Sequence, residues 1–199
     1  MIGAIERDGW RVEFFRHNDR VAHRILRQTA DGPLQVAESK EGTFAEHWPG
    51  SPPFQQVHFE QRESGDVALL VGMAGRSHWS GSVEIRPELG GPVWDVACRA
   101  SDAAQCLGAS YRLAVPAQPL GDQLLLHADG EIVGTAMSFE LDAPIRMELG
   151  AGVLRWRLAP PPVGQPRTYR WRYWFTGPSS DPDAEEAAED ANTAGEAVE

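Results

Sequence analysis

The sequence has few cysteines and no long apolar run. Two cysteines, Cys98 and Cys106, are too few for the disulfide framework of a secreted domain. No stretch of 18 or more apolar residues is present, so we expect no transmembrane helix. The first ten residues, MIGAIERDGW, lack the basic start and apolar core of a signal peptide. These absences predict a cytoplasmic protein with two reduced thiols and no membrane partner.

Basic charge is scarce, and the acidic charge is unevenly placed. The chain has 29 acidic and 18 basic residues, and Lys40 is the one lysine among 17 arginines. Eight acidic residues and no basic residue lie in residues 178–199, so residues 1–177 carry a net charge of only −3. Nucleic-acid binding requires a basic surface, which this balance does not supply. We therefore expect no nucleic-acid partner.

Long amphipathic helices are also missing. Short runs alternate apolar and polar residues, and 20 glycines and 15 prolines separate them with turns. Asp129-Gly130, for example, is a strong hairpin signal. The predicted strands are residues 10–15, 21–26, 34–37, 54–63, 67–71, 82–86, 93–99, 107–115, 124–127, 132–141, 145–149, 153–158 and 167–175. A helix over residues 19–28 is the alternative for the second of these.

These strands predict the fold class and the domain organisation. About 11–13 strands in one chain are typical of an all-β fold, and we expect an antiparallel β-sandwich with about six strands in each sheet. The sandwich should form a single domain over residues 1–177. Residues 178–199 contain no aromatic residue and are rich in Ala, Asp and Glu, so we expect a disordered acidic tail.

Recognised catalytic and metal-binding motifs are absent from the sequence. It contains no GxSxG nucleophile elbow, phosphate-binding loop, GxGxxG fingerprint, CxxC pair or HExxH pair. Six histidines are scattered along the chain at spacings that match no metal site. We therefore predict no cofactor and no metal, and whether the protein is an enzyme stays open at this point.

The stretch from Val67 to Ile85 concentrates the candidate site residues. An apolar run and a glycine-rich bend are followed by Arg76, His78 and Trp79. An arginine binds anions, a histidine transfers protons, and a tryptophan stacks on a sugar ring. The structural alternative is that Trp79 packs in the core, His78 forms a hydrogen bond with a neighbour, and Arg76 is a solvated residue at a strand end.

A second group of candidates lies on neighbouring predicted strands. Asp95 and Arg99 share one face of the strand at residues 93–99, and Tyr111 lies on a later strand. If the charged pair points inward, it lines a pocket; if it points outward, it is an ordinary surface pair, which we slightly favour. His58 lies on a strand that we expect to neighbour the central one, and is a further ligand-binding candidate.

Aromatic residues are plentiful in the last strand, where Tyr169, Trp171 and Tyr173 share a face opposite arginines. We favour a core role for this row over a sugar-stacking platform. The overall pattern is similar in architecture to the large antiparallel sandwiches of aldose epimerases and carbohydrate-binding modules, although no family motif supports that likeness.

Three functions follow as hypotheses. The first is a binding module for a small polar ligand, a carbohydrate or a protein partner. The second is a sugar-active enzyme, epimerase-like or lyase-like, with His78 as acid/base, Arg76 or Arg99 orienting the substrate, and Asp95 beside them. The third is a structural subunit of a larger assembly. The absence of catalytic motifs favours the first.

Overall fold

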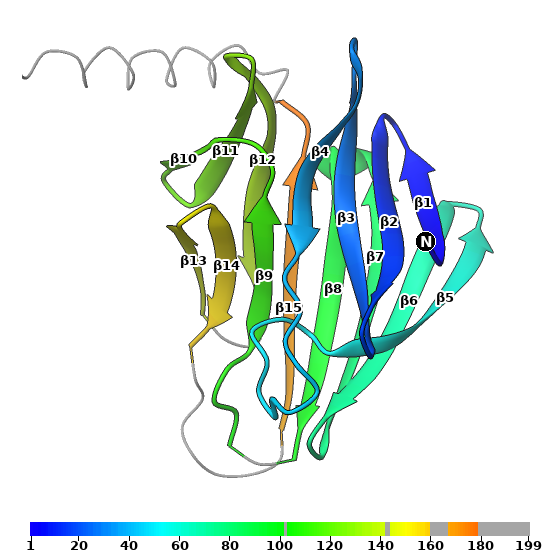
Figure 1. The fold of residues 1–199 in the computed structure, drawn as a ribbon, viewed down its shortest axis with the longest axis vertical. Coiled ribbons are helices and arrows are strands. Elements are labelled where there is room, and N and C mark those ends of the chain that lie inside the picture. Colours follow the sequence, from blue (N-terminus) through cyan, green and yellow to red (C-terminus); the bar gives the residue numbers. More distant parts are fainter. Residues whose placement is uncertain (102, 142–143, 160–166, 179–199) are drawn as a thin grey trace, which may run out of the picture.

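Two antiparallel sheets pack face to face, which confirms the predicted all-β sandwich (Figure 1). The computed structural model describes residues 1–101, 103–141, 144–159 and 167–178, so the expected acidic tail lies almost wholly outside the described residues. Among the described residues, no helix is long and apolar enough to cross a membrane. The one helical segment in them is a single 3-10 turn, η1 (Pro87–Leu89).

The strand order places chain segments that are far apart in sequence side by side. The seven-stranded sheet contains, in spatial order, β1 (Gly3–Arg7), β2 (Trp10–His17), β3 (Arg20–Thr29), β4 (Gly32–Ser39), β9 (Gly108–Leu113), β14 (Val153–Leu158) and β13 (Ile145–Gly150). The eight-stranded sheet contains β10 (Ala117–Leu120), β11 (Gln123–Ala128), β12 (Glu131–Glu140), β15 (Arg167–Thr176), β8 (Gly91–Ala100), β7 (Ser77–Arg86), β6 (Gly65–Ala74) and β5 (Phe54–Arg62).

Most predicted turns are hairpin connections. Asp129 and Gly130 both have positive φ, 52° and 88°, and join β11 to β12 as the Asp-Gly signal predicts. Residues 20–29 form strand β3, so the helical alternative for that segment was wrong. The pairing of β3 with both β2 and β4 explains this outcome, because ladder hydrogen bonds on two sides outweigh a weak helical pattern.

The turn in the central stretch lies later than predicted. We expected a bend from Gly72 and a strand resuming at Ser82, but β6 continues to Ala74 and β7 begins at Ser77. Gly75, at φ 57°, provides the left-handed conformation that the tight turn requires. His78 and Trp79 therefore lie within a strand, on opposite faces of the sheet, and not in a loop.

The core between the sheets is unusually rich in tryptophan. Strand β15 buries Tyr169, Trp171, Tyr173 and Phe175, as its alternation predicts. Other fully buried rings come from both sheets, namely those of Trp10, Phe14, Trp79, Trp94, Tyr111 and Trp156. The rings pack largely edge to face or stacked, as aromatic quadrupoles favour. Most aromatic side chains of the described residues therefore pack in the core.

One long connection closes an end of the sandwich. Residues 40–53, hereafter loop 40–53, lead from β4 in one sheet to β5 in the other. In Figure 1 this loop, drawn in cyan, curls below the end of β4. A hollow of about 520 Å³ separates it from the β8–β9 connection and is lined by Glu46, His47 and Gln105 among others.

Candidate functional site

A groove of about 460 Å³ lies on the outer face of the eight-stranded sheet. Its floor is built from the neighbouring strands β6, β7, β8 and β15. His78 of β7 is directly paired with Arg99 of β8 and with Met73 of β6, so the three side chains form one row across the sheet. Gln55 and Val71 also line the groove. The strand register therefore brings together two of the predicted site residues, His78 and Arg99.

The groove combines exposed apolar surface with unpaired donors. Val71 and Met73 are 50% and 44% exposed, which is high for apolar side chains on a sheet. Within the described part of the chain, the side chains of His78 and Arg99 form no hydrogen bond or ion pair. None of the described residues that line the groove is a carboxylate. Such a surface favours a ligand that carries both an anionic group and an apolar part.

Asp95 lies outside this groove, in an ion-pair cluster on the same face. Its Oδ1 accepts a hydrogen bond from Nε of Arg172 at 2.6 Å, and its Oδ2 accepts one from Nη2 of Arg86 at 3.1 Å. Arg86 also pairs with Glu84 at 2.7 Å. Asp95 is four residues from Arg99 along β8, roughly 13 Å for an extended strand. The outward orientation that we favoured for this pair is therefore the one found.

The remaining predicted site residues are dispersed. Arg76 is exposed in the β6–β7 turn. His58 is exposed on edge strand β5 opposite Leu69, whereas His78 is opposite Met73, so the two histidines are offset by roughly 13 Å along β6. Among the described residues, no group of three or more His, Cys, Asp or Glu side chains could hold a metal ion.

The two aromatic candidates point into the core. Trp79 contributes to the lining of the groove but is only 2% exposed, so it presents no ring face on which a sugar could stack. Tyr111 is 1% exposed and belongs to the opposite sheet. Trp79 is therefore a core residue, as the structural alternative predicted, and does not offer a ring to a ligand.

Tyr111 belongs instead to a buried polar chain that the sequence did not reveal. Its hydroxyl oxygen lies 2.6 Å from Nε2 of His23 and 2.9 Å from the hydroxyl oxygen of Tyr173. Burial lowers the pKa of His23 to about 3 and raises the pKa of both tyrosines well above the usual value. The three side chains are therefore neutral at physiological pH. Nδ1 of His23 has no hydrogen-bond partner.

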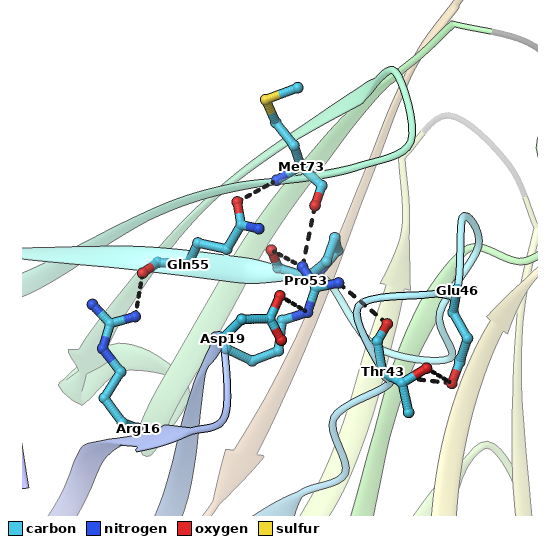
Figure 2. Close-up of polar contacts among 8 residues, drawn as sticks. Arg16, Asp19, Thr43, Glu46, Pro53, Gln55 and Met73 are labelled. Carbon is cyan, nitrogen blue, oxygen red and sulfur yellow. Dashed lines mark hydrogen bonds and ion pairs between the residues drawn. The ribbon is translucent and has the colours of Figure 1, made fainter.

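A buried arginine anchors loop 40–53 next to the groove. Arg20 is 2% exposed and donates hydrogen bonds to the carbonyl oxygens of Pro53, Met73 and Thr43, at 3.2, 3.1 and 3.3 Å (Figure 2). Figure 2 also shows Gln55, whose Oε1 accepts a hydrogen bond from the backbone N–H of Met73. Loop 40–53 and the wall of the groove therefore share one anchor.

The only sequence signal for this anchor is the Asn18-Asp19 turn that precedes it. Arg20 is the first residue of β3, and the side chain of Asp19 lies 3.5 Å from its Nε. A charged residue at the start of a strand is usually solvated. Its burial depends on a loop that returns to it from more than twenty residues along the chain, which no local pattern indicates.

Comparison with protein-family models, curated proteins and solved structures finds no match to this chain.

Proposed function

We propose that this protein is a binding module whose outer-face groove takes a small anionic ligand with an apolar part. The observation that carries the proposal is the row formed by Met73, His78 and Arg99. Arg99 and His78 supply hydrogen-bond donors without a described partner, and Met73 with Val71 supplies the apolar contact. Aliphatic carboxylates, aromatic carboxylates and acidic sugars all belong to this chemical class.

Two features favour binding over catalysis. General acid–base chemistry commonly requires a second titratable group within reach of the first. Among the described groove residues His78 is the one histidine and none is a carboxylate, and Asp95, which lies outside the groove, is engaged by Arg86 and Arg172. The described residues of the groove also present no exposed aromatic ring on which a neutral sugar could stack. A carbohydrate ligand of this groove would therefore be an acidic one.

The proposal also keeps the cytoplasmic location predicted from the sequence. Cys98 and Cys106 are both free thiols, and Cys98 is buried in the core. Free thiols persist in reducing compartments, which supports that location.

The experiment is a binding titration with matched probes. We expect 4-phenylbutyrate to bind in roughly the millimolar range and its neutral analogue 4-phenylbutanol to bind at least about tenfold more weakly, because the alcohol lacks the charge-assisted contact. Galacturonate and galactose form a second pair for the acidic-sugar class. Arg99→Gln should weaken phenylbutyrate binding about tenfold, whereas Arg112→Gln, an exposed arginine of the other sheet, should not. Equal binding of the acid and the alcohol would refute the proposal.

A further inference from the structure

Loop 40–53 joins the two sheets and carries Glu41 next to Ser39 and Arg20. Its two ends are attached to the body: the Lys40 N–H donates a hydrogen bond to the Ser110 carbonyl, Ser51 is hydrogen-bonded to Ser110, and Trp48 packs against the core, whereas residues 43–47 between them are exposed. Arg20 holds Thr43 and Pro53, and the carbonyl of Gly50 accepts hydrogen bonds from Ser110 Oγ and Arg157 Nη1, both at 2.8 Å. The loop contains turns but no strand or helix. Such a segment can open locally without unfolding the sheets.

Glu41 is a half-buried residue of the loop whose carboxyl group has little compensation for its burial. Its Oε1 accepts a hydrogen bond from Ser39 Oγ at 2.6 Å, while Oε2 is buried without a partner. Ser39 Oγ in turn accepts a hydrogen bond from the backbone N–H of His23 at 2.9 Å. A buried carboxylate with one hydrogen bond and one oxygen without a partner has a high desolvation cost, and protonation of the carboxyl group lowers that cost.

The charges that face Glu41 do not offset this burial. Arg20 of β3 attracts the Glu41 carboxylate. Tyr111 on β9 and Tyr173 on β15 also face Glu41, and its negative charge opposes the ionisation of their hydroxyls. His23 is neutral and interacts through its backbone and through Tyr111. Desolvation outweighs the attraction of Arg20, so the pKa of Glu41 is raised from 4.5 to about 7.

We propose that loop 40–53 is a pH-sensitive cover that is closed when Glu41 is protonated and opens when Glu41 ionises. In the open state the carboxylate is hydrated and titrates at its ordinary value, whereas in the closed state it holds its proton to near neutral pH. Closure is therefore strongest at mildly acidic pH and weakens as the pH rises through neutrality. Because Arg20 also holds the carbonyl of Met73, opening would loosen the wall of the outer-face groove. The cover itself does not depend on what that groove binds.

The single lysine provides a direct assay of opening. Lys40 is exposed at the start of the loop, and the peptide bond that follows it leads to Glu41, whose Oε2 is buried. A lysine-specific protease cuts the chain at this one position. Because the Lys40 N–H is held by the Ser110 carbonyl and Glu41 Oε2 is buried, we expect the bond to enter the protease only when Glu41 leaves its site. The cleavage rate of the full-length protein, divided at each pH by that of a peptide matching residues 36–45, reports the open fraction.

The expected result is a normalised rate that rises by up to about tenfold between pH 6 and pH 8.5 in the wild-type protein. Glu41→Gln keeps the size and the acceptor but removes the titration, so its rate, normalised to its own peptide, should be low and independent of pH. His47→Gln is the matched control, because it removes the one histidine of loop 40–53 and leaves Glu41 in place, and it should retain the wild-type profile. A flat wild-type profile, or an unchanged pH dependence in Glu41→Gln, overturns the proposal.

A second measurement needs no variant. The side-chain carboxyl ¹³C shift of Glu41 in the wild-type protein should titrate with the same midpoint as the normalised cleavage rate. A Glu41 titration at the ordinary value for glutamate, or a midpoint different from that of cleavage, would also overturn the proposal.

Discussion

The hydroxyl oxygens of Tyr111 and Tyr173 lie 2.9 Å apart and join the two sheets through the centre of the sandwich. Tyr111 is also within 2.6 Å of His23 Nε2, so one hydroxyl serves two buried partners. The surrounding rings of Trp94 and Trp156 exclude water from this contact. A polar chain in this position helps to determine how the sheets align, because each member has few alternative partners.

Removing the Tyr111 hydroxyl should therefore destabilise the fold. We expect Tyr111→Phe to lower the free energy of unfolding by about 1–3 kcal/mol, because it leaves His23 and Tyr173 with buried unpaired groups. Urea unfolding of Tyr111→Phe, Tyr173→Phe and the double variant should show a coupling of about 1 kcal/mol between the two sites. Strictly additive effects would mean that the contact between the hydroxyls contributes nothing.

Arg20→Gln should release loop 40–53 and destabilise the protein by about 2–4 kcal/mol. The variant leaves the carbonyls of Thr43, Pro53 and Met73 without their donor. Hydrogen exchange should increase in the loop and at Met73, but not in β14. Arg11→Gln, which removes ion pairs at the surface, should change stability by less than about 0.5 kcal/mol. Unchanged exchange in the loop would contradict the anchoring role.

Stability should depend on pH through two buried groups with opposite signs. The pKa of His23 is depressed from 6.5 to about 3, so its contribution is lost as the pH falls below 6.5. The pKa of Glu41 is raised, so its contribution is present below 4.5 and is lost as the pH rises through about 7. Between pH 4.5 and 6.5 the two trends largely cancel.

Glu41→Gln separates these trends. The difference in unfolding free energy between the wild-type protein and this variant should change by about 3 kcal/mol between pH 4 and pH 8, in favour of the variant at high pH. Urea unfolding at pH 4, 5.5 and 8 measures it. Parallel pH profiles for the two proteins would show that Glu41 titrates alike in the folded and unfolded chains.

Asp95→Asn should strengthen the binding of an anionic ligand about two- to fivefold. The substitution removes the negative charge shared by Arg172 and Arg86 and makes the outer face more positive. A catalytic role for Asp95, as in our enzyme hypothesis, predicts loss of turnover instead. Titration with 4-phenylbutyrate at low salt distinguishes the two roles, and weaker binding by Asp95→Asn would count against the electrostatic account.

The sequence predicts those parts of the fold that depend on local alternation. Strands β8 and β15 carry clear two-residue patterns, and their inner and outer faces were assigned correctly. Strands β1 and β10 were missed, and both lie at sheet edges. Neither segment shows a distinctive pattern: β10 contains Pro119 and only one large apolar residue, Leu120.

The candidate site was only partly predictable. His78 and Arg99 were chosen for their chemistry, and the β7–β8 register, which local patterns do not determine, placed them together. The His23–Tyr111 contact joins residues 88 positions apart through β4, so no local pattern reveals it. The burial of Glu41 depends on the path of loop 40–53, which contains several prolines and glycines and has no periodicity.

Anion binding in the outer-face groove can be measured residue by residue in an NMR titration. Addition of 4-phenylbutyrate to the ¹⁵N-labelled full-length protein should shift the amide signals of Met73, His78 and Arg99 in a saturable manner, and 4-phenylbutanol should shift them much less. Arg99→Gln should abolish the difference between the two probes. No saturable shift at these residues, or shifts confined to the seven-stranded sheet, would contradict the account.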